Sequence, residues 1–131
     1  MIYEGTVAFV SLDDKMTKLN VVVSDAVSFA DAERQLEVAF EGEKDLDVVA
    51  LKRSKVKEIA NMSTEHKDFL WIATLADSYV IDGKEKSVKY DILLHAENFE
   101  SAKRFIEEYM KQGYNMELVS LKLTTFVIVI Q

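Results

Sequence analysis

Apolar and polar residues follow the same order of patterns in both halves of the chain. In the first half, β-rich stretches at residues 2–12 and 18–24 flank a polar turn and predict two strands. Apolar residues then recur at helical spacing from Phe29 to Phe40, which predicts a helix with one apolar face. A third β-rich stretch, at residues 47–59, completes the order strand, strand, helix, strand.

The second half is predicted to contain the same elements. Strands are expected at residues 69–81 and 88–94, and the Asp82-Gly83 pair between them is a strong hairpin signal. A helix is expected from Phe99 to Met110, followed by a strand at residues 117–130.

A constant shift of 70 residues relates the two halves. Residues 26–37 align with residues 96–107 without a gap, and Phe29 and Phe99 are among the identical pairs. The same shift aligns residues 49–52 with 119–122, so that Leu51 corresponds to Leu121. A shared offset across helix and strand indicates a duplicated unit. The alternative is that the same helix signal simply occurs twice.

The predicted architecture is one α+β domain made of two pseudo-symmetric β-β-α-β repeats. The repeats span approximately residues 1–60 and 69–131 and are joined by the polar segment 60–68. We expect the strands to form one antiparallel sheet covered by both helices. The related positions Ser28 and Asn98 are expected to cap the helices, and Phe29 and Phe99 to be buried where each helix enters the sheet.

Composition and charge limit the function classes. The chain has 131 residues, of which 49% are hydrophobic and 30% charged, a balance typical of a globular domain. Its net charge of −7 repels phosphate backbones at long range. The absence of cysteine excludes disulfides and thiolate chemistry. Neither a signal peptide nor a membrane-spanning run is recognised, so a cytoplasmic protein without membrane contact is expected.

No catalytic, metal-binding or cofactor-binding constellation is found. His66 and His95 are the only histidines, and neither has partners at zinc-ligand spacing. The four glycines are isolated and form no phosphate-binding loop, and no serine lies in a nucleophile-elbow sequence. We therefore expect a protein that is not an enzyme and has no cofactor.

The one notable charge feature is a run of basic residues within the predicted strand 47–59. It could contact a nucleotide or single-stranded nucleic acid if aromatic side chains nearby stack on bases, or it could only protect an exposed sheet edge. The candidate contacts are Lys52, Arg53, Lys55, Lys57 and Trp71, with Tyr79 and Tyr90 as further aromatics.

The corresponding strand of the second half is entirely uncharged over its last residues. A strand that is apolar on both faces has to be buried on both faces, either in the centre of the sheet or against another subunit. The sequence favours self-association. The candidate interface residues are Phe126, Val127, Ile128, Val129 and Ile130.

Three motifs resemble a family of small proteins from Bacteroidetes and their phages, known only as domain of unknown function 4494 (DUF4494). The motifs are DAVSFADAE at residues 25–33, LKRSKVKEI at 51–59 and FLWIATL at 69–75. Their helix start and their Lys52-Arg53 pair match the family pattern, whereas the apolar C-terminal strand departs from it. The resemblance implies the fold, an association with phages or mobile elements, and no established activity.

Together these observations predict a small non-enzymatic binding or adaptor module in the cytoplasm of a bacterial host. It is expected to act through protein contacts and to be a homo-oligomer or to bind a protein partner. The alternative is a nucleotide-binding or single-stranded nucleic-acid-binding protein that uses the basic strand Lys52–Lys57.

Overall fold

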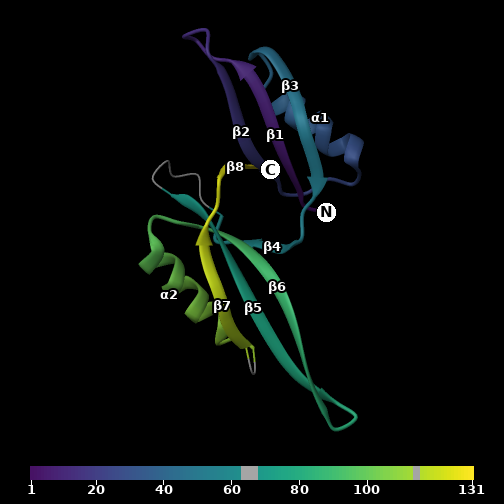
Figure 1. Ribbon diagram of the computed structural model, residues 1–131, viewed down its shortest axis with the longest axis vertical. Helices are drawn as coiled ribbons and strands as arrows, with labels where there is room; N and C mark the ends of the chain where they lie inside the picture. Colours follow the sequence, from purple (N-terminus) through teal and green to yellow (C-terminus); the bar gives the residue numbers. More distant parts are fainter. Residues whose placement is uncertain (63–67, 114–115) are drawn as a thin grey trace. The chain divides into compact units, whose positions relative to one another are not determined.

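The computed structural model describes residues 1–62, 68–113 and 116–131. The protein is a mixed α+β structure in which two helices accompany eight strands, arranged as two four-stranded sheets. The chain divides into two compact units, each with one helix and one sheet (Figure 1). Unit 1 is Met1–Ser54 together with Thr125–Gln131, and unit 2 is Lys55–Thr124. The chain therefore passes from one unit to the other twice.

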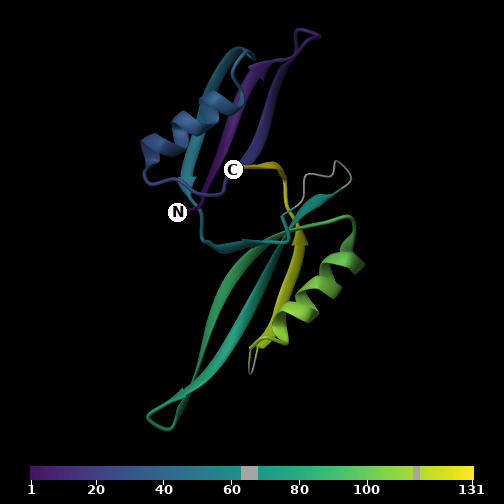
Figure 2. The ribbon, with the colours of Figure 1, turned by 180° about the vertical axis from the view of Figure 1, so that it is seen from behind.

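In unit 1, helix α1 covers one face of a sheet with strand order β3-β1-β2-β8 (Figure 2). Strand β1 pairs antiparallel with β2 and β3, whereas β8 pairs parallel with β2. The elements are β1 (Tyr3–Val10), β2 (Met16–Val23), α1 (Phe29–Ala39), β3 (Lys44–Arg53) and β8 (Phe126–Ile130).

In unit 2, helix α2 packs on a sheet with strand order β4-β6-β5-β7. Strand β5 pairs antiparallel with β6 and β7, and β4 pairs parallel with β6. The predicted hairpin turn is confirmed: Asp82 and Gly83 both have positive φ and link paired residues of β5 and β6. The elements are β4 (Val56–Ala60), β5 (Phe69–Ile81), β6 (Lys84–Ala96), α2 (Phe99–Met110) and β7 (Met116–Leu123).

Each unit has its own apolar core between helix and sheet. In unit 1, Val7 and Val21 of the sheet lie in one cluster with Leu36 of α1, and all three side chains are fully buried. In unit 2, Leu75 and Ile106 are among the fully buried residues of the corresponding cluster. Burying such side chains is the main favourable contribution to folding.

Both predicted helix caps are confirmed. The Ser28 side chain accepts a hydrogen bond from the Asp31 amide, and the Asn98 side chain accepts one from the Ser101 amide. Each bond satisfies an amide of the first turn that has no partner within its helix. In α1 the Asp31 carboxylate in turn accepts a hydrogen bond from the Val27 amide at 3.0 Å. This bond, together with Arg34, lowers the pKa of Asp31.

The expectation of one antiparallel sheet is wrong, because the predicted strands 47–59 and 117–130 are each divided in two. The break falls before Lys55 in the first and before Thr125 in the second, and the chain then joins a different sheet. The Ser54 amide donates to the Ile2 carbonyl, and the Thr124 amide and hydroxyl donate to the Leu70 carbonyl. These bonds hold the end of β3 or β7 in its own sheet, while the next strand pairs elsewhere.

The expected burial of the two helix-entry phenylalanines is also wrong. Phe29 and Phe99 are 51% and 47% exposed. Each is the first residue of its helix and contacts an aromatic ring of the sheet edge-on: Phe29 meets Tyr3 and Phe99 meets Trp71. The positions that point into the cores lie further along each helix.

Candidate functional site

Strand β8 is the terminal strand of the unit 1 sheet and carries no charged residue. The first of the two sequence alternatives, a central position in the sheet, is therefore wrong. Val127 and Ile128 are 57% and 48% exposed, whereas Val129 is buried and Phe126 and Ile130 are half-buried. Two large apolar side chains thus remain in contact with solvent on this strand.

The other three terminal strands differ from β8 in charge. Charged side chains on an edge strand discourage pairing with a strand of another molecule. Such residues are Lys44, Asp45, Asp47, Lys52 and Arg53 in β3, Lys57 and Glu58 in β4, and Glu117 and Lys122 in β7. Among the four sheet edges in the described part of the chain, only β8 lacks this protection.

The C-terminal end of β8 lies beside helix α1. A hollow of about 230 Å³ lies between the two elements and is lined by Arg34, Gln35, Val38, Ala39, Ile130 and Gln131. Val38 is 63% exposed. We call the exposed side chains Val127 and Ile128 of β8 the β8 edge patch.

Strand β8 is joined to the unit 1 sheet through β2 and the residues next to it. It pairs with β2 from Asn20 to Val23, and the Ser24 amide donates to the Ile130 carbonyl at 2.9 Å. Just before the strand, the Asn20 side-chain amide donates to the Thr125 hydroxyl at 2.9 Å.

The basic residues of the sequence do not share one strand. Lys52 and Arg53 end β3 in unit 1, whereas Lys55 and Lys57 belong to unit 2. The Lys57 ammonium lies 4.3 Å from the centre of the Tyr90 ring, a cation–π contact within unit 2. The sequence predicted a single strand, 47–59, for all four residues, and the break before Lys55 removes that arrangement.

The aromatic candidates differ in accessibility. Trp71 is only 9% exposed, and its indole N–H donates to the Ala96 carbonyl at 3.0 Å. Its ring supports the unit 2 core and offers no free face for stacking on a base. Tyr90 is half-buried, and Tyr79 is 40% exposed. Nucleic-acid binding itself stays a prediction.

Unit 2 contains a partly buried polar contact that the sequence did not indicate. The Tyr109 hydroxyl donates to the Glu58 carboxylate at 2.5 Å. Burial and the negative charge of Glu58 raise the pKa of Tyr109, so the phenol stays neutral and acts as a donor. The bond joins α2 to β4 and has a structural role. Its two residues are far apart in sequence, and no local pattern marks the pair.

His95 is a buried residue of β6. It is 7% exposed, and burial lowers its pKa below 6.5, although Asp68 and the hydrogen bond with Asn61 act in the opposite direction. His66 lies outside the described residues. Within residues 1–62, 68–113 and 116–131, no group of three side chains is placed to hold a metal ion.

The lowered pKa of His95 predicts a loss of stability in mild acid. Between the two pKa values the unfolded chain binds a proton at this position and the folded chain does not, so the free energy of unfolding falls as the pH drops below 6.5. Urea unfolding at about pH 7.5 and about pH 5.5 should show a larger loss in the wild type than in His95→Gln. Equal losses in the two proteins would contradict this prediction.

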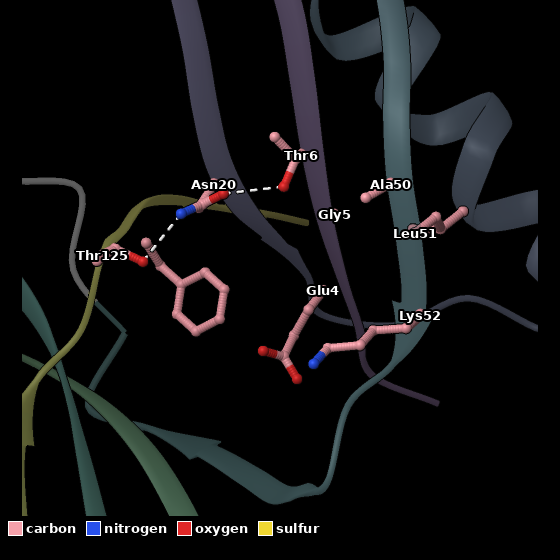
Figure 3. A pocket seen from close by; sticks show the side chains of 9 residues that line it. Glu4, Gly5, Thr6, Asn20, Ala50, Leu51, Lys52 and Thr125 are labelled. Atoms are coloured by element: carbon pink, nitrogen blue, oxygen red, sulfur yellow. Dashed lines mark hydrogen bonds between the residues drawn. The ribbon is translucent and has the colours of Figure 1, made fainter.

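A polar pocket of about 320 Å³ lies on the unit 1 sheet (Figure 3). All four strands contribute to it, through side chains on the face opposite α1. The sequence did not predict this pocket. Its polar residues stand at the polar positions of strands in which polar and apolar residues alternate, and that pattern does not indicate a binding site. The side chains that matter are Glu4, Thr6, Asn20, Lys52, Thr125 and Phe126.

Comparisons with known proteins identify the family. Neither the curated proteins nor the solved structures include a match to this chain. No helix among the described residues is long and apolar enough to cross a membrane. The family model described as domain of unknown function (DUF4494) matches residues 1–131. The chain therefore belongs to the DUF4494 family, as its motifs at residues 25–33, 51–59 and 69–75 had indicated.

Proposed function

We propose that the protein is a non-enzymatic binding module that acts through protein contacts at the β8 edge patch and associates there with a second copy of itself. The observation that carries the proposal is the contrast between the uncharged, exposed β8 and the charged strands at the other three sheet edges.

The physical argument starts from the free edge of β8. A terminal strand presents backbone groups that can pair with an added strand, and its exposed side chains can fit pockets of the partner. An edge of this kind normally carries protective charges, and β8 has none. In a second copy the same strand offers the same edge, so two β8 strands can pair around a two-fold axis.

Sedimentation of an Ile128→Lys variant tests the proposal. Ile128 is 48% exposed, so lysine at this position leaves the core unchanged but places a charge in the proposed interface. We expect a wild-type dimer, and a dissociation constant weakened at least about tenfold in the variant. Circular dichroism establishes that the variant is folded.

The matched control is Val119→Lys. Val119 is 47% exposed on β7, another terminal strand, which already carries charges. This change should leave the mass unaltered. A wild-type protein that stays monomeric at high concentration refutes the self-association, as does an Ile128→Lys variant that dimerises as tightly as the wild type.

We also propose that the two units are copies of one ancestral β-β-α-β unit followed by a short strand. The support is their matching strand order: β3-β1-β2-β8 corresponds position by position to β7-β5-β6-β4, and in each the last strand is parallel to its neighbour. Thr6 bonds Asn20 as Thr74 bonds Asp91. In this scheme Phe29 corresponds to Phe99, and Leu51 to Leu121.

Nucleic-acid binding through Lys52, Arg53, Lys55 and Lys57 is the weaker proposal. Trp71 is buried, and Lys57 already contacts Tyr90. The acidic net charge opposes approach to a polynucleotide. An association with phages and their bacterial hosts rests on the family resemblance alone.

A further inference from the structure

The pocket on unit 1 has a charged end and a hydrogen-bonding end. Tyr3 and Val7 of β1 belong to the core under α1, and Glu4 and Thr6 alternate with them on the opposite face. Gly5 confirms this orientation, since a side chain there would meet Leu36 of α1. Glu4 and Lys52 form the charged end. Thr6, Asn20 and Thr125 form the other.

The hydrogen-bonding end is oriented to donate. The Thr6 hydroxyl donates to the Asn20 side-chain carbonyl at 2.9 Å, and the Asn20 amide donates to the Thr125 hydroxyl at 2.9 Å (Figure 3). This direction uses one amide hydrogen of Asn20 and one acceptor position of Thr125. The second amide hydrogen of Asn20 and the hydroxyl hydrogen of Thr125 remain for a ligand acceptor.

The charged end contains two opposite charges that do not pair. Glu4 and Lys52 face each other across the β1–β3 ladder, and Figure 3 shows Lys52 extending toward Glu4. Within the described part of the chain, neither takes part in an ion pair shorter than 4.0 Å. The carboxylate and the ammonium are therefore both available to a ligand.

We propose that this pocket binds a free α-amino acid whose side chain ends in a hydrogen-bond acceptor, as in glutamine. The ligand ammonium contacts Glu4, its carboxylate contacts Lys52, and its side-chain carbonyl accepts from Asn20 and Thr125. Charge-assisted bonds of this type are about twice as strong as neutral ones.

The charges of Glu4 and Lys52 favour a zwitterionic ligand. Glu4 and Lys52 together carry no net charge, so a ligand without net charge suits them. A phosphate-bearing ligand would bring its negative charge next to Glu4, and a purely cationic ligand would face Lys52. A volume of about 320 Å³ lies at the lower end of ligand pockets, which suits a molecule of this size.

Calorimetric titration of the full chain with four probes tests each contact separately. Glutamine should bind with a dissociation constant of about 1 mM or tighter. N-acetylglutamine lacks the ammonium, glutamine amide lacks the carboxylate, and leucine lacks the side-chain acceptor. Each of these three probes should bind at least about tenfold more weakly than glutamine.

Three variants assign the contacts to the pocket. Glu4→Gln and Lys52→Met should each weaken glutamine binding at least about tenfold. Lys18→Met is the control, because it removes an exposed charge from β2 without altering the pocket lining. Unchanged thermal midpoints without ligand show that the variants are folded.

Two results would overturn the proposal. One is the absence of saturable binding of glutamine up to about 10 mM. The other is binding of N-acetylglutamine as tight as that of glutamine, which would show that the ammonium contact with Glu4 does not exist. Neither result depends on the oligomeric state, so the β8 edge proposal is tested separately.

Discussion

Replacing Leu36 with alanine is expected to lower the free energy of unfolding of unit 1 by about 3–5 kcal/mol. Leu36 is fully buried in the cluster between α1 and its sheet, and truncation loses its apolar contacts and leaves a cavity. Ile106 occupies the corresponding helix position in unit 2 and is also fully buried. Its replacement with alanine should cost unit 2 about 2–5 kcal/mol.

Urea unfolding of both variants measures these costs, and the single tryptophan tells the units apart. Trp71 lies in the unit 2 core, so its fluorescence follows the unfolding of unit 2, while circular dichroism follows both helices. The matched control is Phe29→Ala. Because that side chain is half exposed, its truncation should cost less than about 2 kcal/mol. A larger loss in Phe29→Ala than in Leu36→Ala would contradict the assignment of the core.

The parts of the fold that were predicted correctly are those fixed by local sequence. The N-caps Ser28 and Asn98 act within one helical turn, and the Asp82-Gly83 turn acts within one hairpin. Helical spacing likewise placed Ala32 and Leu36 on the buried face. Phe29 has the same spacing but lies at the helix end, where the sheet covers only part of it. Helical periodicity does not distinguish a position at the helix end from one in its middle.

The exchange of strands between sheets could not be predicted, because it depends on contacts remote in sequence. Nothing near Ser54 or Thr124 breaks a strand, since no proline or glycine is present there. The breaks are instead associated with bonds to Ile2 and Leu70. For the same reason the lack of charge in β8 was evident from the sequence, while its terminal position and the exposure of Ile128 were not.

The pocket could not be predicted from the sequence for a related reason. Its residues come from four strands, and one of those strands follows the others by more than 70 residues. Glu4 and Lys52 become neighbours only through the register of β1 with β3. A single sequence contains no information on that register until the sheet order is known.

Deletion of residues 126–131 is expected to unfold unit 1 selectively. Strand β8 closes the β2 edge of that sheet, buries Val129, and supplies the Ile130 carbonyl that accepts from the Ser24 amide. Its loss removes these contacts and exposes the apolar residues Val21–Val23 of β2 at an open edge. Unit 2 draws all its strands from residues 55–124 and retains them.

Hydrogen exchange followed by mass spectrometry measures this difference. Amides of β1 and β2 should lose at least about 100-fold of their protection in the truncated chain, which corresponds to about 2.7 kcal/mol. The cooperative unfolding transition of Trp71 should persist, because its core lies entirely in unit 2. Deletion of Gln131 alone is the control, since this exposed residue lies outside β8.

If β1 and β2 stay as protected as in the full chain, β8 is an accessory strand whose removal the unit 1 core tolerates. If the Trp71 transition disappears as well, the two units fold as one cooperative body, and the strands that cross between them couple their stabilities.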